Sequence, residues 1–136
     1  MSTDSYALQA RLGAISFDAA LEQVTAALRE EGFGVLTEID VAKTFDAKLG
    51  VEFRPYRILG ACNPALAHRA LEHDAKIGLL LPCNVVVQQV GDDVEVLIVD
   101  PIAMFGVVKD PGMEPIAAEV EQKLQRVAAS LRATNG

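Results

Sequence analysis

Both cysteines and both histidines of this chain lie in one stretch, LGACNPALAHRALEHDAKIGLLLPCNVVV, residues 59–87. Thiolates and imidazoles are the side chains that bind zinc and related metals, and a thiolate is also a strong nucleophile. Cys62 and Cys83 are each followed by asparagine, and each has a proline close by. The stretch is therefore where a metal site, a redox pair or a ligand pocket would be sought first.

The spacing of the histidines argues against a metal site. Structural zinc sites use closely spaced ligand pairs such as CxxC or HxxxH. His68 and His73 are five residues apart, which separates them by about 140° around a helix. They cannot both face one ion in a continuous helix. We therefore expect two surface histidines and no metal.

The two thiols allow a sharper hypothesis. Cys62 directly precedes Asn63-Pro64, which is typical of a helix start because asparagine is a good N-cap and proline fits the first helical position. Backbone amides and the helix dipole at such an end favour a thiolate. Cys83 follows Pro82 at the start of a strand, and if the two strands are neighbours the thiols could face each other. They could then hold a soft metal, form a disulfide or carry sulfur; the alternative is two small buried apolar residues.

The same helix start offers a site for an anion or a small ligand. The backbone amides of Asn63, Ala65 and Leu66 would attract an anion, and Asn84 could add a donor. However, Pro64 has no amide hydrogen, and no glycine-rich loop is present to let a phosphate approach. An ordinary capped helix is the alternative. Carboxylates are scattered along the chain, so acid–base catalysis finds little support.

The elements that must position these residues follow from the hydrophobic periodicity. Alternating or continuous apolar runs predict strands at residues 5–12, 33–39, 56–61, 83–90 and 94–99. Apolar stripes at a spacing of three and four predict four helices, which follow Ser16, Asp40 and Asn63 and begin near Pro115. The last two strands form a hairpin around Gly91-Asp92-Asp93. The order β-α-β-α-β-α-β-β-α predicts an α+β fold, a mixed and mostly antiparallel sheet with the helices packed on one face.

Composition narrows the class of protein. A chain of 136 residues is most simply one domain, residues 1–136. Its mean hydropathy of +0.25 is high for a small domain, so we expect apolar surface that meets a partner, most simply a homodimer. The net charge of −7 argues against nucleic acid and anionic membranes as partners. The sequence begins without a signal-peptide pattern, which favours a cytoplasmic protein with reduced thiols.

Three segments carry a resemblance to a known family: TEIDVAKTFDAKLGVEFRPYRILGACNPALAHRAL, IGLLLPCNVVV and VEVLIVDP. They make the chain, from Tyr6 to about Leu131, resemble the DUF302 family of uncharacterised bacterial and archaeal domains. The family's NP, G, P and DP positions match Asn63-Pro64, Gly78, Pro82 and Asp100-Pro101, and the cysteines look like one common variant of the pattern. The resemblance implies a compact dimeric α+β domain with a curved, largely antiparallel sheet. It implies no reaction, cofactor or catalytic residue.

These observations lead to one hypothesis about function. The chain is expected to be a small cytoplasmic dimeric binding module for an apolar or thiol-reactive ligand, and the cofactor is unknown. Its pocket would form where Cys62-Asn63-Pro64 and Pro82-Cys83-Asn84 meet, with Asp100, otherwise a turn residue, as a nearby acid. One alternative is an enzyme of thiol or sulfur chemistry, with Cys62 as nucleophile and Cys83 as resolving thiol. The other is a purely structural or interaction domain.

Overall fold

A five-stranded antiparallel sheet forms the centre of the computed structural model, which describes residues 6–135. Its strands are β1 (Ala7–Gly13), β2 (Gly34–Asp40), β3 (Tyr56–Cys62), β4 (Cys83–Val90) and β5 (Asp93–Val99). They lie in the order β1-β5-β4-β3-β2, and all four pairings are antiparallel. The predicted α+β class is confirmed, with a fully antiparallel sheet in place of a mixed one.

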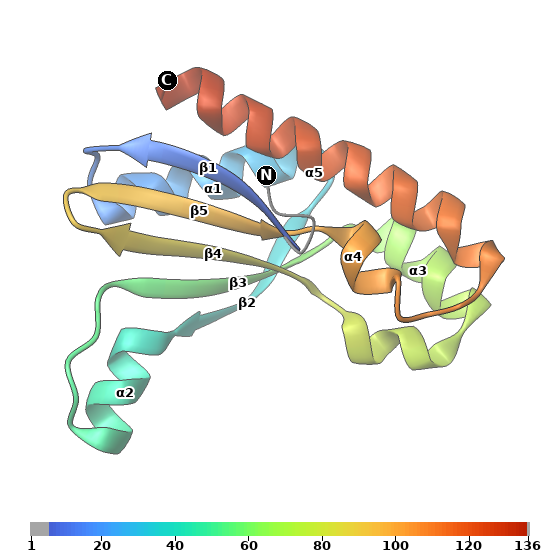
Figure 1. The fold of residues 1–136 in the computed structure, drawn as a ribbon, viewed down its shortest axis with the longest axis horizontal. Helices are drawn as coiled ribbons and strands as arrows, with labels where there is room; N and C mark the ends of the chain where they lie inside the picture. Colours follow the sequence, from blue (N-terminus) through green and yellow to red (C-terminus); the bar gives the residue numbers. More distant parts are fainter. Residues whose placement is uncertain (1–5, 136) are drawn as a thin grey trace.

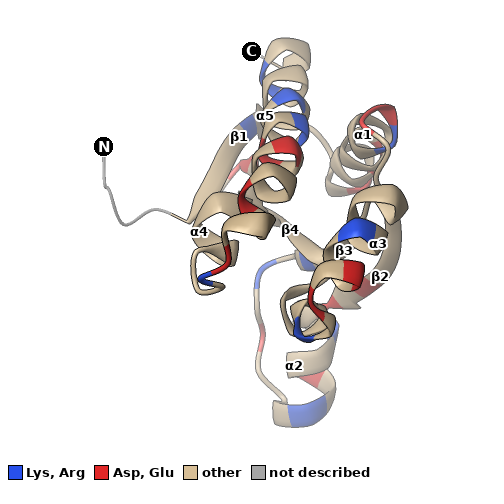
Figure 2. Ribbon diagram, turned by 90° about the vertical axis from the view of Figure 1, so that its right-hand side faces the viewer, with Lys and Arg blue, Asp and Glu red and all other residues tan. Residues whose placement is uncertain are grey.

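Three helices cover one face of this sheet (Figure 1). They are α1 (Phe17–Glu30), α3 (Pro64–His73) and α5 (Glu114–Asn135). Shorter elements complete the chain: α2 (Val41–Leu49), α4 (Pro101–Phe105) and the 3₁₀ turns η1 (Ala75–Leu80) and η2 (Pro111–Met113). The sequence did not predict α4 or η2. Acidic and basic residues are interspersed along α1, α3 and α5 (Figure 2).

The first three helices start where the sequence predicted them, because each has a side chain that satisfies a free backbone amide. The Ser16 hydroxyl accepts from the amide of Ala19 at 3.1 Å, and the Asp40 carboxylate accepts from Lys43 at 2.9 Å. A carboxylate also caps α4, which is stabilised by the bond from the Ile102 amide to Asp100 at 2.9 Å. Such caps contribute about 0.5–2 kcal/mol each.

The core lies between the covered face of the sheet and the helices. Alternate residues of the central strands point into it because side chains alternate across a strand. The fully buried members of this layer include Val85, Val87, Val94, Val96 and Ile98 from the sheet and Val24, Leu28, Leu124 and Val127 from the helices. These residues form one continuous cluster.

The opposite face of the sheet, here called the open face, has a different character. Ile39, Ile58, Val86 and Leu97 are cross-strand neighbours and form one apolar row across four strands. Ile39 is 50% exposed. The prediction that the helices pack on one face is wrong for α2, which has no buried residue and stands apart from the other helices (Figures 1 and 2).

Aromatic contacts explain the position of α2. The Phe45 ring meets Phe53 at 5.1 Å between ring centroids, and Phe53 meets Tyr56 at 5.8 Å. Tyr56 pairs with Gln88 on the open face. Phe45, from the apolar stripe of α2, therefore packs against the connection to β3 and not into the core.

Candidate functional site

The predicted site residues come together at one end of the sheet. β3 ends there, β4 begins there, and β5 runs into the cap of α4. Ala61 lies opposite Cys83, and Gly60 lies opposite Asn84. The strands that carry the two cysteines are therefore neighbours, as the thiol hypothesis required.

The register of these strands separates the two cysteines. Cys83 faces Ala61 across the ladder, so Cys62 is offset from Cys83 by one residue, although both residues line the same small cavity. Cys83 is 5% exposed, Cys62 is partly buried, and both are free thiols that are not at disulfide distance. The expectation of two thiols that face each other is not supported.

The environment of Cys83 suppresses its reactivity. Burial raises the pKa of this thiol to about 11, and the neighbouring Cys62 adds to the shift. Because the thiolate is the reactive form, Cys83 is an unreactive neutral thiol at physiological pH. Its position suits a core residue better than a resolving thiol.

Only a small space lies between the cysteines and the helices. This cysteine cavity has a volume of about 20 Å³. Apolar side chains make most of its wall, including Leu66, Phe105, Ile116 and Val120 together with both cysteines. A space of this size holds about one water molecule and no organic ligand.

The polar residues of the predicted site are engaged in holding the backbone. The Asn63 side chain accepts from the Leu66 amide at 3.3 Å and donates to the Glu31 carbonyl at 3.4 Å. Asp100 caps α4. These contacts tie α3 to the end of α1 and α4 to the end of β5. Among the predicted polar site residues, the exposed Asn84 has no such backbone contact in the described part of the chain.

Two prolines of the predicted site also have structural roles. Pro64 occupies the first turn of α3, where a missing amide hydrogen costs nothing. Pro82 packs against Gly60: a side chain at Gly60 would overlap the Pro82 ring and the Thr37 hydroxyl. Gly60 is therefore required by close packing across three strands.

The two histidines have separate acidic partners. His68 pairs with Glu72 one turn further along α3 at 3.1 Å. The Nε2 atom of His73 lies 2.7 Å from Asp110. Within residues 6–135, no three His, Cys, Asp or Glu side chains are grouped in a way that could hold a metal.

A much larger cavity lies beside the predicted site and was missed by the sequence interpretation. This α4–α5 cavity has a volume of about 720 Å³. Most of its wall is apolar and comes from α4, the loop that follows it and the first turns of α5: Ile102, Phe105, Val108, Met113, Ala117 and Ala118. Phe105 is 5% exposed and lines both cavities. Phe105 therefore contributes to the walls of both cavities.

A polar rim closes one side of the α4–α5 cavity. Asp110 accepts from the Gly112 amide at 2.9 Å and pairs with His73. The bond from Gly112, and then the bond from His73, hold the pKa of this carboxyl below its usual range. Gly112 lies so close to the His73 ring that a side chain there would overlap it. Lys109 and Glu114 complete the rim.

A signal for this region was present in the sequence. Asp100-Pro101 and Asp110-Pro111 repeat the pattern of Asn63-Pro64, a capping side chain followed by proline. The sequence interpretation treated Asp100-Pro101 as the end of a strand. Each pair in fact opens a helical turn, and the two turns frame the α4–α5 cavity.

The fold and the site define a small α+β domain with one antiparallel sheet, a helical layer on one face and a ligand-sized cavity near one end. The family model described as "Domain of unknown function DUF302" matches residues 9–131, so the chain belongs to the DUF302 family. A solved structure, that of an uncharacterized conserved DUF302 protein from Bacillus stearothermophilus, is 30% identical with a TM-score of 0.85. The match covers 93% of this chain and 98% of that chain. No curated protein matches this chain.

Proposed function

We propose that this protein is a dimeric binding module that holds a small, mostly apolar ligand in the α4–α5 cavity. The observation that carries the proposal is the size and lining of that cavity. Ligand sites typically enclose about 300–1,000 Å³ and combine apolar walls with a few polar groups. The α4–α5 cavity has about 720 Å³ with an apolar wall and the polar rim around Asp110.

The ligand site is proposed beside the cysteine motifs and not between them. The cysteine cavity is about 20 Å³ and the Cys83 thiol is neutral. These two facts also give little support to the alternative of a thiol enzyme. A cytoplasmic location, where thiols stay reduced, fits the two free cysteines. In the described part of the chain, none of the helices has the length and apolar character needed to cross a membrane.

Indole binding tests the proposed site, because the chain contains no tryptophan and the fluorescence of this small apolar probe is therefore distinct. Ala118→Leu extends a side chain into the cavity from α5. The matched control is Ala129→Leu, at an exposed position of the same helix. We expect saturable binding to the wild type and to Ala129→Leu, and weaker binding to Ala118→Leu. Equal binding to all three proteins would overturn the proposal.

The open face supports the dimeric part of the proposal. A row of four large apolar residues on an uncovered sheet face is a typical interaction surface. In a two-fold dimer the same row would pack against itself, because such interfaces are self-complementary. The row includes Val86 and Leu97, at the centre of the sheet.

Sedimentation at micromolar concentration tests the dimer. Leu97→Lys places a charge in the apolar row, whereas Leu79→Lys places the same charge in η1, at a residue that is 86% exposed. We expect the wild type and Leu79→Lys to be dimers and Leu97→Lys to be a monomer. A monomeric wild type would contradict this part of the proposal.

A further inference from the structure

Arg54, on the connection between α2 and β3, is held in one orientation although it is exposed. The central carbon of its guanidinium lies 4.4 Å from the centre of the Phe53 ring and 5.6 Å from that of Tyr56. Its Nε donates to the Oε1 of Gln88 at 2.8 Å. An exposed arginine rarely has a fixed direction, since ordering its long side chain costs conformational entropy.

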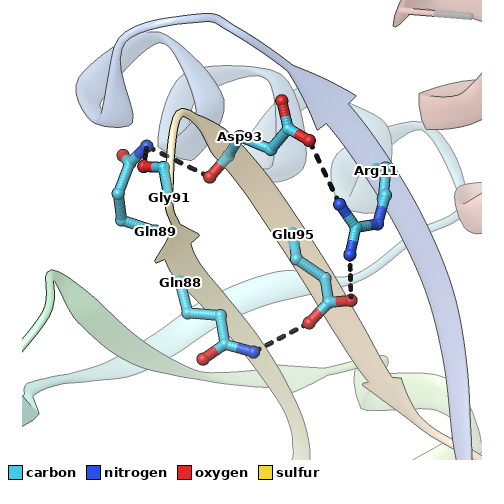
Figure 3. A network of polar contacts seen from close by, with 6 residues as sticks. All are labelled: Arg11, Gln88, Gln89, Gly91, Asp93 and Glu95. Carbon is cyan, nitrogen blue, oxygen red and sulfur yellow. Dashed lines mark hydrogen bonds and ion pairs between the residues drawn. The ribbon is translucent and has the colours of Figure 1, made fainter.

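Gln88 has the burial and the partners needed to hold Arg54. It is 8% exposed and is the buried polar residue of the described chain. Its Nε2 donates to Glu95 at 2.8 Å, and Glu95 lies 4.0 Å from Arg11, which in turn bonds Asp93 at 3.1 Å (Figure 3). The Glu95 contact fixes the amide, so that its carbonyl oxygen is presented to Arg54.

The charge of Arg54 is not neutralised by this arrangement. Carboxylates pair with Arg11, Arg57, Arg69 and Arg126, and the Gln9 carbonyl accepts from Arg132. The partner of Arg54 is instead a neutral amide. Within residues 6–135, its two terminal nitrogens have no hydrogen bond or ion pair. Both are therefore available to donate side by side to the two oxygens of a planar anion.

We propose that Arg54 binds the carboxylate group of an aromatic or other flat acid on the open face. The two terminal nitrogens would donate to its two oxygens, which is the strong bidentate arrangement. The rings of Phe53 and Tyr56 would contact the body of the acid. This site is separate from the α4–α5 cavity. The proposed occupant is a free acid; a carboxylate side chain of a second copy is the second source that the experiment separates from it, and that source rests on the proposed dimer.

Benzoate titration followed by NMR of arginine side chains tests the first source. The bond to Gln88 makes the Nε–H of Arg54 slow to exchange and therefore observable, and its absence in Arg54→Lys assigns it. Arg54→Lys keeps the positive charge but loses the planar pair of terminal nitrogens. The control is Arg29→Lys, an exposed arginine at the end of α1. We expect benzoate to shift the Arg54 signal saturably and to bind Arg54→Lys about tenfold more weakly, with Arg29→Lys unchanged.

Sedimentation of the same variants tests the second source. If the carboxylate belongs to a second copy, Arg54→Lys weakens self-association about tenfold and Arg29→Lys does not. If the wild type is a monomer, the second source is excluded. The benzoate titration alone then decides the proposal. If Arg54→Lys changes neither benzoate binding nor self-association, or if Arg29→Lys has the same effect, the proposal is overturned.

Discussion

The cysteine cavity and the α4–α5 cavity share the Phe105 ring but differ in almost every other respect. The first lies beneath the CNP and PCN motifs and has a volume of about 20 Å³. The second lies between the capped turns at Asp100-Pro101 and Asp110-Pro111, away from both cysteines, and has about 720 Å³. The difference shows that the motif residues hold the backbone together, whereas the space for a ligand lies where two capped turns keep a loop away from α5.

The largest effect is expected from removal of the shared wall. Phe105→Ala takes a buried ring from between the two cavities, and such changes cost about 3–5 kcal/mol of unfolding free energy. Chemical denaturation measures the loss. Val107→Ala is the control, because Val107 is 71% exposed and its truncation should stay within about 0.5 kcal/mol. If Phe105→Ala loses no more free energy of unfolding than Val107→Ala, the Phe105 ring does not stabilise the walls of the two cavities.

A smaller effect is expected at the cysteine end. Gly60→Ala places a methyl group against Pro82 and Thr37, and overpacking of this kind costs about 1–3 kcal/mol. Gly34→Ala, in β2, meets no atom within 4 Å and is the matched control. Equal stability of the two variants in denaturant would mean that this end of the sheet is loosely packed, in contrast to the account given above.

The two thiols are expected to react at different rates. At pH 8 a disulfide reagent should modify the partly exposed Cys62 and leave Cys83 unmodified until denaturant is added, because Cys83 is buried and neutral. In Cys62→Ser no fast phase should remain. Two equally fast thiols in the native protein would contradict the burial of Cys83.

The raised pKa of the Cys83 thiol predicts a loss of stability at alkaline pH. Its pKa is about 11 in the folded protein against an ordinary value of 9.0, so the unfolded chain releases the proton first. The stabilising contribution is complete below about pH 9 and is lost as the pH rises towards 11. Cys83→Ala should have a flatter stability curve in this range. An unchanged curve would exclude Cys83 as the cause.

The smallest effect is expected at the rim of the α4–α5 cavity. Because the pKa of Asp110 is depressed below its ordinary 3.8, its stabilising bonds to Gly112 and His73 are present above that value and are lost as the pH falls through the depressed pKa. NMR of the Gly112 amide should report this transition. Asp110→Asn should abolish it, and Asp92→Asn, in the exposed hairpin turn, should not. A transition that persists in Asp110→Asn would assign the titration to another group.

Local features of the fold could be predicted from the sequence because local chemistry decides them. Ser16, Asp40 and Asn63 were identified as caps, and they cap helices. The register between β3 and β4 could not be predicted, because these strands are joined through α3 and η1 and not by a tight turn. One residue of register decides whether Cys62 or Ala61 faces Cys83.

The α4–α5 cavity was not predicted from the sequence for a related reason. A proline after an aspartate can end a strand or open a helix, and only tertiary packing decides between the two. The placement of α2 also depends on tertiary contacts, since its apolar stripe was visible but the Phe53 ring that Phe45 meets lies outside the helix.

The most direct test of the proposed function is to locate bound indole by intermolecular nuclear Overhauser effects to the protein's methyl groups. The account predicts contacts to Met113 and Ala117, which line the α4–α5 cavity. Contacts to Leu66 and Val120 alone, which line the cysteine cavity, or to Val86 and Leu97 on the open face, would contradict it.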